Sequence, residues 1–141
     1  MKKYQFSTQT AISAEHLYNG ISDIGNWPKW DNELETTSFN GPLVAGTRFT
    51  IKPKDGPLVA MELIEASAPL RFINLAHLPL AKIRSSHFFT PQSDGTTKIE
   101  MSIEVFGLLE FLWDRLIARK LAQEAAEHTQ AFLDYVAARQ A

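Results

Sequence analysis

Hydrophobic positions in the C-terminal part of the chain recur at spacings of three and four residues. The run begins at Gly107, extends to about Arg139, and contains no further glycine and no proline. This spacing predicts one helix with a single apolar face, about 48 Å long at ~1.5 Å per residue. We expect Leu116 and Leu121 to be core residues on that face, which comprises Leu109, Leu112, Trp113, Leu116, Ile117, Leu121, Ala125, Phe132 and Val136. Such a helix needs a large surface to pack on, and the rest of the chain predicts a sheet.

The chain before this helix alternates polar with apolar residues, as strands with one buried face do. The clearest case is Ile99, Met101, Ile103 and Val105, each flanked by polar residues. Two short helices are expected after the first strand, one N-capped by Ser13 and one at residues 23–30. Strands are predicted at residues 2–11, 33–39, 46–51, 58–67, 70–76, 82–90 and 98–105. This order predicts an α+β fold, with an antiparallel sheet of six or seven strands curled around the C-terminal helix.

Composition sets limits on the function. The 141 residues fit one domain spanning 1–141, and a net charge of −2 gives no basic surface for nucleic acid. The chain has no cysteine, no apolar signal segment and no run of ~20 apolar residues, so we expect a cytoplasmic protein without membrane insertion. The four histidines lack metal-ligand spacing, and no metal or other cofactor is expected. The oligomeric state, monomer or homodimer, stays open.

Short motifs at the predicted element boundaries resemble those of one protein superfamily. Residues 13–18 resemble Pro-Ala-Glu-x-Val-Trp, with serine in place of proline, and residues 23–30 resemble Asp-x-x-x-Trp-Pro-x-Trp. Residues 46–49 are similar to a Gly-x-x-Phe strand start, and Gly107 to the glycine before the last helix. In this order the motifs resemble the START-like or SRPBCC superfamily, the helix-grip proteins, and most closely its polyketide cyclase/dehydrase branch.

The resemblance implies a helix-grip fold in which a seven-stranded sheet and the C-terminal helix enclose a cavity. It implies a small hydrophobic ligand, such as a lipid, an aromatic compound or a polyketide-like molecule. It assigns no catalytic residue. The residues we expect near such a ligand are Trp27, Trp30, Phe49, His87, Phe89, Met101, Leu109 and Trp113.

Two tryptophans in this set have alternative interpretations. Trp27 and Trp30 are three residues apart and so lie on one side of a short helix. They either form an aromatic gate at the mouth of the cavity or anchor the short helix to the sheet. Leu109 and Trp113 belong to the first turns of the long helix, where the cavity of this superfamily opens.

His87 is the candidate residue for chemistry. It shares a strand face with Ile83, Ser85 and Phe89, so the alternation turns it toward the concave side of the sheet. Burial there would lower its pKa below about 6.5 and keep the ring neutral. Two interpretations are open. A neutral imidazole can orient a ligand or transfer a proton, or it can be a core residue bonded to a neighbouring hydroxyl.

Three functions are compatible with the sequence. The first is a carrier or sensor for a small hydrophobic molecule, and the second is a cyclase- or aromatase-type enzyme that uses His87. The third is a protein adaptor similar to the chaperone activators of this fold, although the sequence indicates no long exposed apolar patch. The polar content of the cavity separates the first two, because proton transfer needs a donor or base within hydrogen-bond reach of the substrate.

Overall fold

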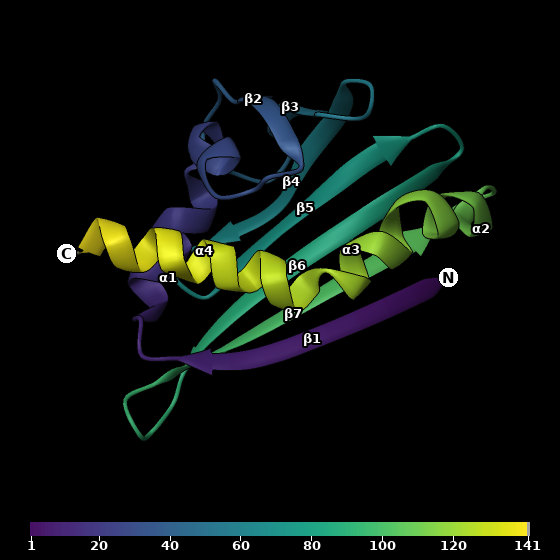
Figure 1. Ribbon diagram of the computed structural model, residues 1–141. Coiled ribbons are helices and arrows are strands. Elements are labelled where there is room, and N and C mark those ends of the chain that lie inside the picture. Colours follow the sequence, from purple (N-terminus) through teal and green to yellow (C-terminus); the bar gives the residue numbers. More distant parts are fainter. Residues whose placement is uncertain (141) are drawn as a thin grey trace.

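A single antiparallel sheet forms one layer of the molecule, and the helices lie across its concave face (Figure 1). The computed structural model describes residues 1–140. Its strands are β1 (Lys2–Thr10), β2 (Leu34–Ser38), β3 (Arg48–Pro53), β4 (Val59–Ser67), β5 (Arg71–Leu78), β6 (Ala81–Pro91) and β7 (Thr97–Phe106). The seven strands are ordered β1-β7-β6-β5-β4-β3-β2, so β1 and β2 form the two edges. This architecture confirms the predicted α+β helix-grip fold.

Two short helices follow β1, as the sequence predicts. They are α1 (Ala14–Ser22) and the 3-10 helix η1 (Ile24–Lys29). The side chain of Ser13 caps α1 by accepting a hydrogen bond from the backbone N–H of His16 at 3.2 Å. This cap satisfies one of the N–H groups that the first turn of a helix leaves without a partner.

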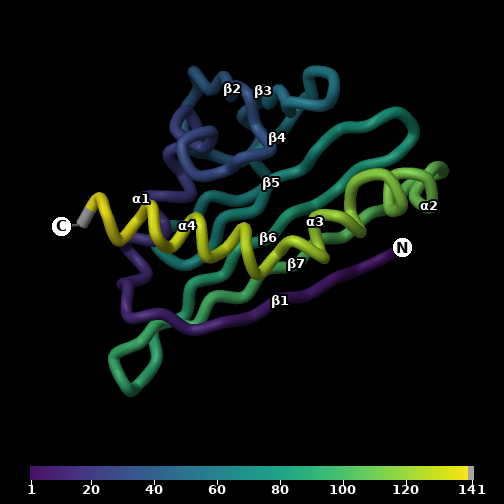
Figure 2. The backbone as a smooth tube through the Cα atoms, in the orientation of Figure 1, coloured from purple at the N-terminus to yellow at the C-terminus, as the bar shows by residue number. Residues whose placement is uncertain are grey.

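The C-terminal helix differs from the prediction because it is divided into segments. These are α2 (Glu110–Trp113), the π-helical turn η2 (Asp114–Ala118), α3 (Arg119–Gln123) and α4 (Ala125–Gln140). Glu124 leaves helical geometry, with φ −97° and ψ 4°, and separates α3 from α4. The tube in Figure 2 follows these segments along one side of the sheet. The helix also begins at Glu110, later than the predicted start near Gly107.

The π-helical turn changes which residues face the sheet. A π-turn inserts one extra residue into the helical repeat, so the apolar spacing of three and four no longer marks the inner face. Asp114 and Ala118 are buried instead, whereas Leu112 and Leu116 are exposed. The prediction that Leu116 is a core residue was therefore wrong. Leu121 is half-buried and packs against a small cluster that includes Ala118.

Asp114 attaches this helix to the edge strand β1. The Tyr4 hydroxyl donates a hydrogen bond of 2.6 Å to Asp114 Oδ1, and Arg119 donates one of 3.3 Å to Oδ2. The bond to Asp114 raises the pKa of Tyr4. A buried carboxylate needs such partners, because removing it from water without them costs several kcal/mol or more. The contact therefore stabilises both the helix start and the sheet edge.

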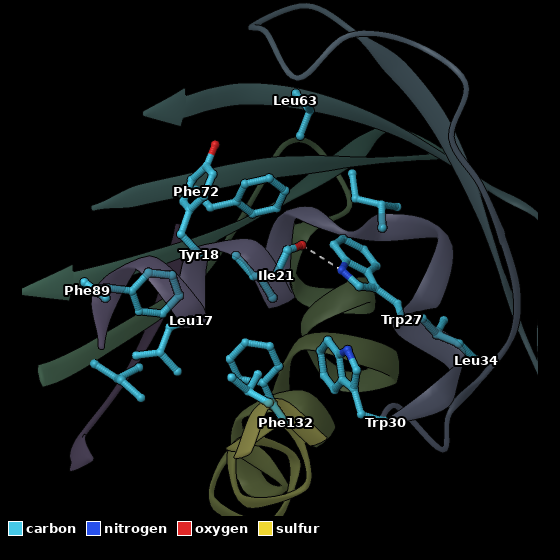
Figure 3. Packing of buried hydrophobic residues seen from close by; sticks show 14 of the residues in the cluster. Leu17, Tyr18, Ile21, Trp27, Trp30, Leu34, Leu63, Phe72, Phe89 and Phe132 are labelled. Atoms are coloured by element: carbon cyan, nitrogen blue, oxygen red, sulfur yellow. Dashed lines mark hydrogen bonds between the residues drawn. The ribbon is translucent and has the colours of Figure 1, made fainter. Parts of the chain in front are cut away.

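The main core lies between the sheet and the helices α1, η1 and α4. Figure 3 shows Leu17, Phe72, Phe89 and Phe132 converging on it from these elements. Leu17, Leu63 and Phe72 have no exposed surface. The largest buried side chains are thus at the end of the sheet covered by α1 and α4.

Replacement of leucine by alanine tests the face assignment. Leu63→Ala should lower the free energy of unfolding by about 2–5 kcal/mol, since Leu63 is fully buried. Leu116→Ala should change it by less than about 0.5 kcal/mol, because Leu116 is 56% exposed. Urea denaturation measures both variants. A large loss in Leu116→Ala would mean that the π-helical turn does not form in solution.

Removal of one hydroxyl tests the contact between β1 and the helix. Tyr4→Phe should lower the free energy of unfolding by about 1–3 kcal/mol, because it removes a hydrogen bond from the buried carboxylate of Asp114. Tyr135→Phe is the matched control. Its hydroxyl bonds only to the exposed Arg139 among the described residues, and the expected loss is below about 0.5 kcal/mol. Equal losses in the two variants would contradict a stabilising role for the Tyr4–Asp114 bond.

Candidate functional site

A small cavity lies between the sheet and α4, beside η1. Its volume is about 20 Å³, which is the space of roughly one water molecule. Most of its wall is apolar. Three side chains with an ionisable or hydroxyl group also line it: His87 from β6, and His128 and Thr129 from α4. The lining residues are Ile21, Trp30, His87, Phe89, Ile99, Met101, His128, Thr129 and Phe132.

Two buried polar atoms at this cavity have no hydrogen-bond partner in the part of the chain that the structure describes. They are Nε1 of Trp30 and Nδ1 of His87. The Trp30 side chain is only 7% exposed, and Figure 3 shows it beside Phe132. Each such group costs about 1–3 kcal/mol if it stays unpaired. Buried polar groups are normally satisfied, so these two nitrogens are exceptions within residues that line one cavity.

His87 reaches the cavity from the centre of the sheet. It lies on β6 and pairs with Phe72 on β5 and Met101 on β7. The residue as a whole is half-buried, but its Nδ1 atom is fully enclosed. Burial, together with the nearby His128, lowers the pKa of His87 from 6.5 to about 4. The ring is therefore neutral near pH 7, as the strand alternation predicts, and one nitrogen donates while the other accepts.

A second histidine borders the cavity from the helix side. His128 on α4 forms a hydrogen bond of 3.0 Å between its Nε2 and Oδ2 of Asp31. Its ring centre is 5.1 Å from that of Trp30, which in turn packs 4.9 Å from Phe132. Asp31 thus fixes the orientation of His128 at the rim. Asp31 was missed in the sequence, although it directly follows the Trp-Pro-x-Trp motif.

Four of the eight residues expected near a ligand line this cavity: Trp30, His87, Phe89 and Met101. Trp27 and Phe49 lie in the core with ring centres 5.8 Å apart, and the Trp27 Nε1–H donates to the Ile21 carbonyl at 2.8 Å. Leu109 and Trp113 lie at the far end of the sheet, where the Trp113 Nε1–H donates to the Pro79 carbonyl at 2.9 Å. The two tryptophans therefore have different positions. Trp27, within η1, packs in the core and anchors this helix to the sheet, whereas Trp30, at the C-cap of η1, lines the cavity.

A second cavity of about 20 Å³ continues along the helix toward Tyr4. Met101 lines both cavities, and its sulfur accepts a hydrogen bond of 3.2 Å from the Thr129 hydroxyl. Methionine is unbranched and flexible, so Met101 is the most adaptable side chain that the two cavities share. The second cavity is lined by Tyr4, Gln5, Phe6, Met101, Ile103, Ala122 and Ala125.

Within residues 1–140, no three metal-ligating side chains converge, and no helix is long and apolar enough to cross a membrane. The polar groups of the residues that line the cavity are the neutral His87 imidazole, the Trp30 indole N–H, the Thr129 hydroxyl and His128, which is bonded to Asp31.

The lowered pKa of His87 makes stability depend on pH. The unfolded chain binds a proton on this histidine near pH 6.5, whereas the folded protein does so only near pH 4. Stability should therefore fall as pH decreases from 6.5 toward 4, by up to about 1.4 kcal/mol per pH unit from this group. His87→Phe should flatten the decrease in that window. NMR titration of the ring checks the premise, and a pKa near 6.5 for His87 would contradict its burial.

Solved structures of other proteins share this fold at low sequence identity. TTHA0849 from Thermus thermophilus is 14% identical, with a TM-score of 0.75, and the match covers 99% of this chain and 100% of that one. A START superfamily protein from Mycobacterium smegmatis is 15% identical, with a TM-score of 0.73 and 99% of each chain covered. Truncated norcoclaurine synthase from Thalictrum flavum is 16% identical, with a TM-score of 0.73, covering 96% and 92% of the two chains.

These likenesses establish the helix-grip fold and leave the function to the site itself. No curated protein sequence matches the chain. The family model described as "Polyketide cyclase / dehydrase and lipid transport" matches residues 1–139. The chain therefore belongs to this polyketide cyclase/dehydrase and lipid transport family.

Proposed function

We propose that this protein binds a small hydrophobic molecule that carries an oxygen acceptor, such as a carbonyl or hydroxyl group. The observation that supports this is the pair of unpartnered buried atoms, Trp30 Nε1 and His87 Nδ1, at one apolar cavity. An indole N–H can only donate, so the group that it recognises must accept. The neutral His87 can donate or accept according to its tautomer, which suits either a carbonyl or a hydroxyl oxygen.

Ligand binding on this proposal requires the cavity to enlarge. A cavity of about 20 Å³ holds one polar group, whereas pockets for drug-sized ligands measure roughly 300–1,000 Å³. The walls most suited to move are Met101, which lines both cavities, and α4, which the non-helical residue Glu124 separates from α3. The apolar part of the guest would then extend from the Trp30–His87 end toward the second cavity.

A second candidate function is acid–base catalysis on a bound polyketide-like or aromatic molecule. It is favoured by the two histidines at the cavity, one neutral and one paired with a carboxylate. One ring nitrogen of the neutral His87 can accept a proton, and Asp31 holds the His128 ring beside the same cavity, so two imidazoles are available for proton transfer with a bound substrate. On this alternative His87→Phe should reduce turnover by about 10²-fold or more, whereas a carrier would have no turnover to lose.

Two tryptophan variants test the proposed binding mode. The probes are 3-hydroxyflavone, which has acceptor oxygens, and pyrene, which has none. Trp30→Phe should weaken 3-hydroxyflavone binding about tenfold from the micromolar range, the equivalent of one hydrogen bond of about 1.4 kcal/mol. It should leave pyrene binding within about twofold. Fluorescence titration measures both dissociation constants.

Trp27→Phe is the matched control, because its N–H is already bonded to Ile21 within the core. It should reduce stability by about 1–3 kcal/mol and leave the affinity for both probes unchanged. Native mass spectrometry of protein purified from its own host gives an independent test by detecting a co-purified ligand. If neither probe binds and only the unliganded mass is found, the cavity is part of a filled core and the proposal fails.

A further inference from the structure

An exposed apolar surface lies at the end of the molecule where α2 meets the turn between β5 and β6. Five large side chains there, which we call the apolar tip, are between 36% and 80% exposed: Leu80, Leu108, Phe111, Leu112 and Leu116. The sequence indicated no such patch, because the helix was expected to bury Leu112 and Leu116. Contiguous exposed apolar surface usually marks a site of interaction.

These side chains are held together by backbone contacts. The N–H of Leu109 donates to the Leu80 carbonyl at 3.0 Å, which joins the β5–β6 turn to the helix start. Gly107 permits this approach, because a Cβ there would lie 2.7 Å from Ala81 Cα and its φ is +118°. Leu108 lies just before α2, Phe111 and Leu112 lie within it, and Leu116 lies in the π-helical turn η2. Figure 1 shows α2, the β5–β6 turn and the N-terminus at the same end of the sheet.

Exposed basic residues lie near the apolar tip along the chain and in the register of the sheet. Lys82 follows the β5–β6 turn, Lys2 pairs with Val105 at the end of β7, and Arg115 lies beside Leu112 and Leu116 on the helical segment. Three carboxylates lie near this end, and the first of them, Glu104, lies opposite Lys3 on β1 and Arg84 on β6 in the register of the sheet. Glu110 forms an ion pair of 2.7 Å with the Met1 amine, and Asp114 is only 2% exposed. The tip is thus locally cationic although the whole chain has a net charge of −2.

We propose that the apolar tip docks on the surface of a lipid bilayer that contains anionic head groups. Leucine and phenylalanine side chains flanked by lysine and arginine are the pattern of segments that lie in the interface of such a bilayer. The surface is a helix end and a turn, and neither of the two cavities described above is lined by its residues. Two copies docked tip to tip would bring like charges together.

This docking surface is independent of the cavity. A hydrophobic ligand of the kind proposed above dissolves in bilayers. Docking would therefore bring the cavity close to the bilayer that holds this ligand, a consequence that rests on the proposed function. The docking itself depends only on residues of the tip and can be tested without any ligand.

Vesicle sedimentation tests the proposal on the full chain. Vesicles of phosphatidylcholine with one quarter phosphatidylglycerol should bind the protein, and pure phosphatidylcholine vesicles should bind it at least about fivefold more weakly. The double variant Phe111→Ser/Leu116→Ser should reduce binding to the anionic vesicles about tenfold or more. Its matched control is Leu43→Ser/Leu58→Ser, two leucines exposed by 40% and 63% outside the tip, which should bind like the unaltered protein.

Charge variants test whether the basic residues near the apolar tip contribute to binding of anionic head groups. Lys82→Gln/Arg115→Gln should weaken binding to anionic vesicles severalfold, and Lys29→Gln/Lys54→Gln should not. Circular dichroism and the thermal midpoint verify that every variant is folded. Absence of binding to anionic vesicles, or equal binding by the tip and control variants, would overturn the proposal. So would a dimer in light scattering that the Phe111→Ser/Leu116→Ser variant abolishes while vesicle binding is unchanged.

Discussion

The close packing of α1 on α4 at Gly20 fixes the position of the C-terminal helix over the sheet. A Cβ at Gly20 would lie 2.8 Å from Cγ2 of Val136 and 3.2 Å from Cε1 of Phe132. Any larger side chain would push α4 outward, because interiors of this density yield little. Phe132 lies one helical turn after His128, so the same contact sets the distance from His128 to Trp30 and to Asp31. The geometry of the cavity therefore depends on one residue that does not line it.

Strands such as β1 and β7 were predictable because their buried and more exposed residues alternate, whereas β5 is buried on both faces from Phe72 to Leu75. The helix was harder. Its burial pattern depends on Asp114, a charged residue that spacing assigns to solvent but that Tyr4 and Arg119 hold inside. Spacing also treats Trp27 and Trp30 alike, whereas tertiary contacts give them opposite roles. The Asp31–His128 pair joins residues 97 positions apart, and no local pattern reports such a contact.

The cavity combines a cost in stability with a capacity for recognition. Two polar nitrogens without protein partners destabilise the fold, and the surrounding apolar core must offset this cost. Natural proteins tolerate such violations mainly where they bind or react. Sequence reasoning identified His87 from strand phase, yet the absence of a partner for its Nδ1 depends on every side chain around it. Only the packed structure reveals that Trp30 shares this condition.

The pairing of β1 with β7 has a consequence for how the chain folds during synthesis. Lys2 pairs with Val105 and Thr10 with Thr97, so β1 cannot pair until β7 has been synthesised. At about 5–20 residues per second, the delay is on the order of 5–20 seconds. During that time Tyr4 and Phe6 have no sheet to cover them, and the sheet from β2 to β6 can form by consecutive hairpins without β1. The β1–β7 edge is thus the last part of the sheet to close on the ribosome, and the Tyr4–Asp114 bond follows once Asp114 has been made.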